Sequence, residues 1–433
     1  MSIAITGGQV LTEAGLVDAN VLIAGSTIAA VGTDIPLPGD ARGIDASGSV
    51  VLPGLVDLKA HFREPGHEEA ETIETGSRGA ALGGYTAVVA MPNTEPTIDS
   101  LSLVRDVRKI AETALCEVVA AAAMTVGRKG ELLTPMGELA AEGVRIFTDA
   151  GRGVQDPAIM RSIMEYATGL HAITGGDPVV LAQHCEVSAL TNGGHMHEGE
   201  WATRLGMKGQ PSEAETLMMS RDITLARMTG ARIHFQHIST AGSVELIRAA
   251  KAEGLDITAE VATHHFALTD AACATYDPVF KVNPPLRTAE DVAAIHAGLA
   301  DGTIDCIVTD HAPHEPHTKE FPFDQAPPGM LGLESALAIA LNELELPVER
   351  IVELMSTRPA QLAGIGDRHG APIASGNRAN LTVVNLDETW TIDGQAMASR
   401  SHNSPYDGRA VSGKVTHTIY EGELVVADGV ATR

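Results

Sequence analysis

Residues 51–66 read VLPGLVDLKAHFREPG and pass from an apolar run into charged and imidazole side chains. A buried strand that opens into a functional site has this pattern. Alternate side chains of a strand lie on opposite faces, so Asp57, Lys59 and His61 are expected on one face. A histidine and a carboxylate there indicate a metal site, but a lysine ammonium has donors and no lone pair for a metal. The stretch therefore predicts a functional site in which the histidine and the carboxylate favour a metal ion and the lysine disfavours one.

Beyond this stretch, the chain alternates short apolar segments with helical ones. Eight such units, each an apolar segment and then a helix or loop, predict a (β/α)₈ TIM-type barrel over residues 53–365. An open doubly wound sheet is the alternative, but no GxGxxG motif or P-loop follows the first strand. The eight predicted strands lie near 55–57, 86–91, 117–123, 144–148, 179–183, 233–236, 257–262 and 306–309.

Both ends of the chain have a different texture. Residues 1–52 and 366–433 read as short β-strands separated by glycine-containing turns such as Ala24-Gly25-Ser26 and Glu421-Gly422. We expect the two ends to pair into one small β-sandwich domain. The predicted fold class is therefore α/β, a barrel with a small β-sandwich contributed by both termini.

The composition excludes several classes of protein. Aromatic residues make up only 3% of the chain, so its core must consist of Ala, Val, Leu and Ile, which suits parallel strands covered by helices. The net charge of −26 argues against nucleic acid or an anionic membrane surface as partners. No apolar run reaches the roughly 18 residues that span a membrane. Scattered cysteines without CxxC spacing, and no secretory signal in MSIAITGGQV, predict a cytoplasmic protein.

Polar residues follow most of the predicted strands directly. In a barrel these strand ends converge on one mouth, where catalytic groups belong. One histidine at a strand end is usually structural, but five separate strands that end in histidine argue against that interpretation. The residues are His61, Asn93, His184, His237, His264 with His265, and Asp310 with His311.

Two of these histidines end similar strands, in AQH (182–184) and FQH (235–237). Neutral imidazole is a common zinc ligand, so His184 and His237 are candidates to hold one metal. Asp310 follows the last strand, beside His61 of the first when the barrel closes, and a carboxylate there can accept a proton from an attacking water. A helix cap or loop ion pair is the alternative role for Asp310, but its setting in TDHAPH (309–314) favours the site.

These motifs carry a resemblance that covers nearly the whole chain. The sequence resembles a class I dihydroorotase, the long bacterial type, within the amidohydrolase superfamily. The matching motifs, in order, are PGLVDLKAHFREPG, MPNTEP (91–96), AQHCE (182–186), HEG (197–199), QHIS (236–239), NPPLR (283–287), TDHAPH (309–314) and APPGMLGLE (326–334).

The resemblance implies a hydrolase of pyrimidine biosynthesis that opens the ring of dihydroorotate reversibly to N-carbamoyl-aspartate. It implies Zn²⁺, one or two ions per chain, with Asp310 also as the general acid/base. A planar guanidinium suits a substrate carboxylate, and an amide can donate to one. The implied metal ligands are His61, His184, His237 and Asp310; the implied substrate-binding residues are His61, Phe62, Arg63, Asn93, Asn283, His314, Pro328 and Gly329.

Two positions depart from the family pattern. The family usually has histidine where this chain has Lys59, and a metal-bridging aspartate where it has Ala150. Strand parity places Asp149 on the face away from the barrel lumen. We therefore expect that Asp149 does not replace the bridging aspartate that is missing at Ala150. The ammonium of Lys59 is expected to pair with Asp310 and to depress the pKa of that carboxylate. Hydantoinases bridge their metals with a carboxylated lysine on strand four, whereas Lys59 lies on strand one.

Three functions remain open at this stage. The first is a working zinc dihydroorotase. The second is a catalytically weak or inactive homologue that acts as a structural partner of aspartate transcarbamoylase. The third is another cyclic amidase, such as a hydantoinase or allantoinase, although Arg63 and Asn93 favour a ring that bears a carboxylate. The family also implies a homo-oligomer, and the proline-rich segment 321–329 is either a mobile flap or a rigid connector.

Overall fold

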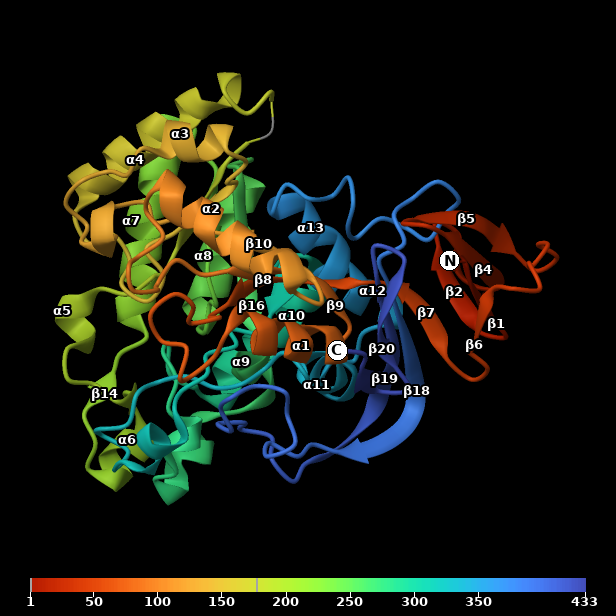
Figure 1. Cartoon of the computed structure of the whole chain (residues 1–433). Helices are drawn as coiled ribbons and strands as arrows, with labels where there is room; N and C mark the ends of the chain where they lie inside the picture. The colour runs from red at the N-terminus through yellow and green to blue at the C-terminus, as the bar shows by residue number, and fades with distance from the viewer. Residues whose placement is uncertain (1, 177) are drawn as a thin grey trace.

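The computed structural model describes residues 2–176 and 178–433 (Figure 1). Eight parallel strands pair in chain order, and parallel bridges join Ala122 to Phe147 and Ala60 to His311. The second bridge joins the segment after the last strand to the first strand, so the eight strands form a closed ring, which we call the strand ring. They are β8 (Leu55–Ala60), β9 (Tyr85–Ala90), β10 (Glu117–Ala120), β11 (Ile146–Phe147), β12 (Val180–Gln183), β15 (Ile233–Phe235), β16 (Ile257–Ala262) and β17 (Cys306–Val308).

Small aliphatic side chains fill the inside of the strand ring. Val56, Val89, Ile146 and Val308 belong to one buried cluster there. Ala150 is a member of the same cluster, whereas Phe147 belongs to the cluster outside the ring. Ile146 and Ala150 therefore line the lumen, as expected if Asp149 lies on the opposite face of its strand.

Helices surround the strand ring, as Figure 1 shows. The long ones are α1 (Ile73–Leu82), α2 (Leu101–Ile110), α4 (Pro157–Gly169), α7 (Glu213–Thr229), α8 (Ala241–Ala252), α10 (Ala289–Asp301) and α11 (Ala336–Glu343). The short ones are α3 (Met136–Ala141), α5 (Ser188–Thr191), α6 (Glu200–Leu205), α9 (Thr263–Ala267), α12 (Val348–Val352) and α13 (Arg358–Leu362). Local capping sets their ends: the Thr288 hydroxyl accepts from the Asp291 amide, and the Asp291 carboxylate accepts from the Thr288 amide.

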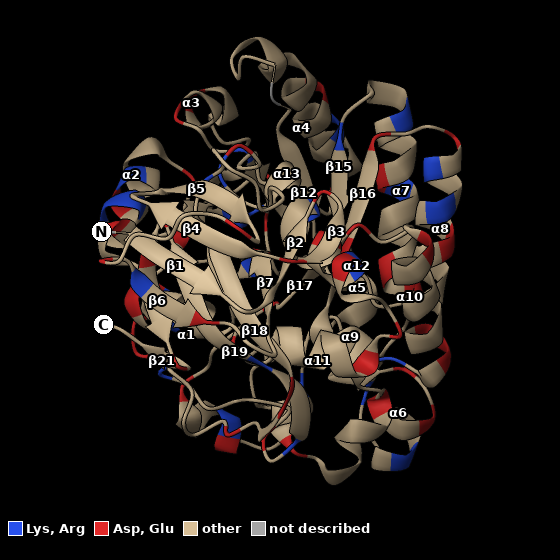
Figure 2. Cartoon of the chain, turned by 90° about the vertical axis from the view of Figure 1, so that its right-hand side faces the viewer, with Lys and Arg blue, Asp and Glu red and all other residues tan. Residues whose placement is uncertain are grey.

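The surface of these helices mixes both signs of charge. Figure 2 shows Asp and Glu together with Lys and Arg on α7 and α8, and Asp and Glu on α10. Examples are the ion pairs of Arg227 with Glu253 and of Arg248 with Asp301. Among the described residues, no helix is long and apolar enough to cross a membrane.

Strands from both ends of the chain share one sheet. Antiparallel pairing joins β7 (Val50–Pro53) to β18 (Leu381–Thr391). The seven-stranded sheet has the order β21-β20-β19-β18-β7-β2-β3, and a four-stranded sheet has the order β5-β4-β1-β6. The remaining strands are β1 (Ser2–Thr6), β2 (Gln9–Thr12), β3 (Gly15–Asp18), β4 (Asn20–Ala24), β5 (Thr27–Gly32), β6 (Arg42–Asp45), β13 (Met196–His197), β14 (Gly209–Gln210), β19 (Ala410–Tyr420), β20 (Glu423–Ala427) and β21 (Val430–Ala431).

The core between these two sheets also draws on both ends of the chain. Ile5, Val21 and Ile44 pack in one buried cluster with Val383 and Ile419. The apolar faces of the terminal strands are thus covered only when strands from both ends of the chain pack together. The boundaries at residues 52 and 366 stay a prediction.

Candidate functional site

The predicted strand-end residues converge at the carboxyl end of the strand ring, which we call the mouth. His61 Nδ1 lies 2.6 Å from Asn93 Oδ1, and His61 Nε2 lies 3.5 Å from Asp310 Oδ1. His184 Nδ1 and His237 Nε2 are 2.9 Å apart. The charges of Asp310 and Lys59 both act on His237, so the two halves of the mouth adjoin each other.

Three residues of the mouth hold backbone conformations that non-glycine residues rarely adopt. Their φ angles are positive: 61° for Arg63, 32° for His237 and 48° for Asp310. Such residues concentrate at functional sites, where the surrounding packing enforces them. Each lies two or three residues after the end of a strand of the ring, so the strained turn sets the direction of its side chain.

Lys59 supplies a buried positive charge to the mouth. Its side chain is 2% exposed, and its Nζ lies 3.7 Å from Asp310 Oδ1. Burial alone would raise the pKa of Asp310, but the charge of Lys59 and the contact with His61 outweigh it and hold this pKa well below its usual range. Burial lowers the pKa of His61 to about 4, so His61 is neutral at physiological pH. The predicted pairing of Lys59 with Asp310 is confirmed.

Glu186 holds the other half of the mouth together. Its Oε2 lies 3.1 Å from His184 Nε2 and accepts from Asn283 Nδ2 at 2.6 Å. Burial would raise the pKa of Glu186, but the hydrogen bond from His184 and further donors lower it to about 2. Since His184 Nε2 donates to this carboxylate, Nδ1 is the ring nitrogen that His184 turns towards His237. A carboxylate commonly fixes the tautomer of a catalytic or metal-binding histidine in this way.

Sequence reasoning assigned no role to Glu186, although it lies in the motif AQHCE. Its spacing gave a usable signal, because a carboxylate two residues after a strand-end histidine returns to the same side of the chain. Asn403 was missed entirely. Its Nδ2 donates to the carbonyls of Ala312 and Gly329 at 3.0 and 3.1 Å, and its Oδ1 accepts from the His314 amide at 3.3 Å. No local pattern in SHNSPYDG (401–408) predicts that Asn403 makes these three hydrogen bonds.

The position of Asp149 decides how many anionic ligands the mouth offers. Its Oδ1 accepts from the amides of Met124 and Thr125 at 2.9 and 3.0 Å, and its Oδ2 accepts from the Thr125 hydroxyl. Asp149 therefore points away from the lumen, which confirms the parity argument, and Ala150 points into it without a ligand atom.

The donor set does not fit a complete metal site. Within residues 2–176 and 178–433, no group of three or more His, Cys, Asp or Glu side chains could hold a metal ion. His184 with His237, and His61 with Asp310, come together only as pairs. The assignment of these four residues as metal ligands stays a prediction.

Arg63 and its neighbours form the side of the mouth expected to bind a carboxylate. Arg63 Nε donates to the Pro313 carbonyl at 3.1 Å, and burial lowers the pKa of Arg63 to about 10, so the guanidinium stays charged. His314 Nε2 donates to the Pro328 carbonyl at 2.8 Å. Burial, followed by the charge of Arg63, lowers the pKa of His314 to about 2. His314 is therefore a neutral donor already held by Pro328.

Phe62 lies elsewhere than the other predicted binding residues. Its side chain is buried in the core cluster outside the strand ring. A Cβ added to Gly76 of α1 would meet the Phe62 ring at 2.5 Å, so the aromatic ring packs on this helix. The Phe62 ring is therefore not available to a substrate, and only the backbone of Phe62 is left for the predicted contact.

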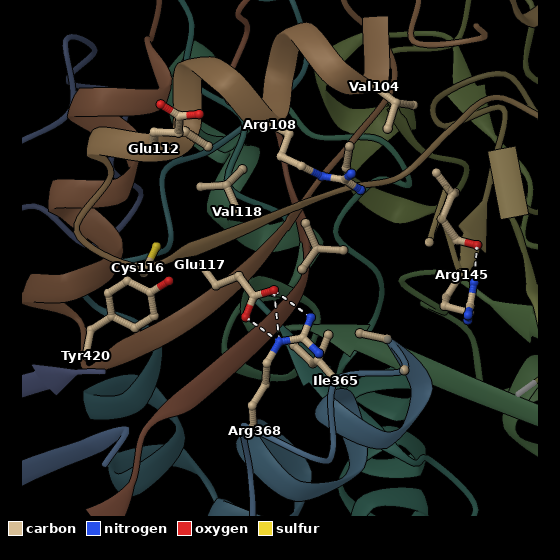
Figure 3. Close-up of a pocket in the computed structure, with 17 residues that line it drawn as sticks. Val104, Arg108, Glu112, Cys116, Glu117, Val118, Arg145, Ile365, Arg368 and Tyr420 are labelled. Atoms are coloured by element: carbon tan, nitrogen blue, oxygen red, sulfur yellow. Dashed lines mark hydrogen bonds and ion pairs between the residues drawn. The ribbon is translucent and has the colours of Figure 1, made fainter. Parts of the chain in front are cut away.

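Two cavities distinguish the ends of the strand ring. Glu186, His195, Asn283 and Pro328 line a cavity of about 780 Å³ at the mouth. Figure 3 shows a second cavity, of about 450 Å³, which is lined by none of the predicted site residues. There Arg368 binds Glu117 at 2.6 Å, and Glu117 begins β10, so this ion pair lies at the amino end of the strand.

Comparison with known proteins adds an independent line of argument. Residues 48–243 match the family model described as Dihydro-orotase-like. The dihydroorotase of Mycobacterium leprae is 48% identical over 431 residues, 98% of each chain. The dihydroorotase of Streptomyces coelicolor is 44% identical and covers 95% of this chain and 96% of its own. The solved L-hydantoinase of Arthrobacter aurescens superposes with a TM-score of 0.88 at 26% identity, over 100% of this chain and 97% of its own.

Proposed function

The chain belongs to the dihydroorotase family, and we propose that its mouth opens the ring of dihydroorotate reversibly to N-carbamoyl-aspartate, as in pyrimidine biosynthesis. As a member of this family it is a cyclic amide hydrolase. We interpret the strand ring as the predicted (β/α)₈ barrel, in line with the hydantoinase fold that it matches. We also infer a cytoplasmic location from the cysteine pattern.

Unused hydrogen-bonding groups at the mouth carry this proposal. Among the described residues, Arg63 makes only the Nε bond to Pro313, which leaves both Nη groups for a ligand. Asn93 accepts from His61 through Oδ1, which leaves its NH₂ group. Asn283 Oδ1 is buried without a partner. Two sets of donors suit a carboxylate, and a buried acceptor suits a ring N–H, which together describe dihydroorotate.

Each side chain then has a role in the proposed reaction. Arg63 and Asn93 bind the substrate carboxylate, while Asn283 and the Pro328-Gly329 backbone hold the ring. The role of His314 in binding the carboxylate requires its Nε2–H to leave the Pro328 carbonyl. Asp310 is ionised at neutral pH and takes a proton from the attacking water. The water oxygen adds to the ring carbonyl carbon, the carbon–nitrogen bond breaks, and the proton passes to the ring nitrogen. The low pKa of Asp310 makes it a weak base, which predicts a slow enzyme.

Zinc is the cofactor that the resemblance implies, and the donor set limits its use. His184 and His237 supply two imidazole nitrogens, and Glu186 holds the His184 ring from the other side. A third ligand is missing, since structural and catalytic zinc sites use three or four protein ligands. We therefore assign no step of the reaction to a metal.

One observation favours a second candidate function. The ion pair of Lys59 with Asp310 engages the proposed base, which is the arrangement expected of an inactive homologue. Such a chain would act as a structural partner of aspartate transcarbamoylase, and either function is compatible with a homo-oligomer. A hydantoinase-like activity is less favoured, because its neutral ring would leave Arg63 unpaired in the mouth.

The decisive experiment measures cyclisation of N-carbamoyl-aspartate by the purified protein, with the metal content determined on the same sample. Turnover that Arg63→Met abolishes, and that an exposed-site control such as Lys109→Met leaves unchanged, supports the dihydroorotase proposal. Absence of turnover at any metal content rejects it in favour of the structural partner. Hydantoin turnover without carbamoyl-aspartate turnover favours the third activity.

A further inference from the structure

The carboxylates near the mouth are already engaged elsewhere. Asp149 binds residues 124 and 125 on the far side of its strand. Glu186 accepts from His184, Asn283 and Thr191, the last at 2.5 Å. In the part of the chain that the structure describes, Asp310 is thus the carboxylate left to pair with Lys59, and neither Asp149 nor Glu186 is free to bridge a metal there.

The ammonium of Lys59 occupies the place beside Asp310 that a cation would take. Its distance of 3.7 Å from Asp310 Oδ1 is longer than a direct hydrogen bond, which measures about 2.7–3.2 Å. No described residue forms a hydrogen bond with Lys59 Nζ. An ammonium carries three donors, and burying them unpaired is unfavourable. The mouth therefore holds a fixed cation whose donors remain available to a ligand oxygen.

The ion pairs of the mouth specify the ligand. Asp310 contacts Lys59, whereas no described carboxylate forms an ion pair with Arg63. The Arg63 guanidinium is therefore available to bind one carboxylate of a ligand. Hydrolysis of a ring amide creates a second carboxylate at the former carbonyl, and Lys59 provides its counter-charge once a proton has moved to Asp310 or solvent.

We propose that Lys59 is a built-in replacement for a divalent metal ion and makes the mouth a metal-independent binding site for a dicarboxylate. This inference rests on the proposed function for the identity of the dicarboxylate, N-carbamoyl-L-aspartate. Lys59 acts by charge: it holds Asp310 in place and receives the carboxylate that ring opening forms. A divalent ion beside Asp310 would meet this ammonium at short range and be repelled.

The test is calorimetric binding of N-carbamoyl-L-aspartate and of dihydroorotate, with and without EDTA, to the unmodified protein. We expect less than about 0.2 zinc ions per chain and affinities that EDTA changes by less than about twofold. Lys59→Met should weaken N-carbamoyl-L-aspartate by about tenfold or more and dihydroorotate much less, because only the former brings a second carboxylate.

The matched control is Lys251→Met. Lys251 also forms a Lys–Asp pair, 2.7 Å from Asp305, but at the amino end of β17, while Asp310 follows its carboxyl end. This variant should leave both affinities unchanged. Circular dichroism checks that each variant is folded. If Lys59→Met does not fold, the double variant Lys59→His with Ala150→Asp takes its place, and its ligand binding should become sensitive to EDTA.

The outcomes separate this inference from the proposed function. EDTA-resistant binding that depends on Lys59, but without turnover, supports the inference and rejects the enzyme. Binding that requires zinc in the unmodified protein, or equal losses in Lys59→Met and Lys251→Met, overturns the inference whether or not turnover occurs. Failure of both ligands to bind rejects both.

Discussion

Replacing Lys59 with methionine tests how strongly its buried pair stabilises the mouth. Methionine keeps much of the apolar stem but removes the ammonium, so Asp310 keeps its charge with His61 as neighbour at 3.5 Å. Two unit charges 3.7 Å apart attract by about 4.5 kcal/mol at an effective dielectric constant of about 20. Breaking a buried pair lowers stability by about 3–5 kcal/mol. We expect Lys59→Met to lower the free energy of unfolding by about 3–4 kcal/mol.

Urea unfolding followed by circular dichroism measures this change, with Lys251→Met as the reference. Asp305 loses Lys251 in that variant but keeps Arg358 at 3.2 Å. The Lys251 side chain is also a quarter exposed, so water screens its charge. We therefore expect a loss below about 1 kcal/mol.

The double variant Lys59→Met with Asp310→Asn isolates the charge from the packing. Without Lys59 the damage comes from an unpaired buried carboxylate, so neutralising Asp310 should restore about 2 kcal/mol or more. A single variant that loses less than about 1 kcal/mol, or a double variant no more stable than Lys59→Met, would refute the assignment of a buried ion pair to this position.

Three further predictions follow from other contacts. Arg63→Met should weaken dihydroorotate binding by about 1.5–3 kcal/mol in calorimetry, because a charged donor pair is lost, and Arg63→Lys should recover part of it. Glu186→Gln should raise KM by about tenfold with little change in kcat, because Asn283, which holds the ring, loses its charged acceptor, and steady-state kinetics measures the split. Against its burial, hydrogen bonds from His369 and Arg368 lower the pKa of Glu117 to about 2. A lowered folded pKa stabilises the protein above the unfolded value of about 4.3 and is lost as pH falls towards 2, so unfolding measured across this range should show a fall that Glu117→Gln flattens.

The strands were predictable where local periodicity governs them. The apolar run at 257–262 matches β16 in full, and the run at 86–91 is shifted by one residue from β9. The predicted strand at 144–148 is only Ile146–Phe147 in the structure. It ends early because Asp149 turns to the amides of Met124 and Thr125, and a contact with another loop leaves no trace in local periodicity.

The sequence by itself determined which chemical groups the mouth can contain. It offers a lysine and an alanine at positions where the family resemblance implies metal ligands, and it offers the arginine and asparagine that suit a carboxylate. The second statement depends on residue type and on the order of strands, which the apolar pattern reveals, whereas the first depends on the resemblance.

Only the tertiary structure decided which of these groups lie together. It placed Lys59 beside Asp310, joined Glu186 to Asn283, and brought Asn403 from the end of the chain to brace the mouth. Ion pairs and hydrogen bonds act over a few ångströms, whereas these partners are far apart along the chain. Their contacts exist because the strand ring closes β8 against the segment after β17, and that closure results from packing of the whole chain.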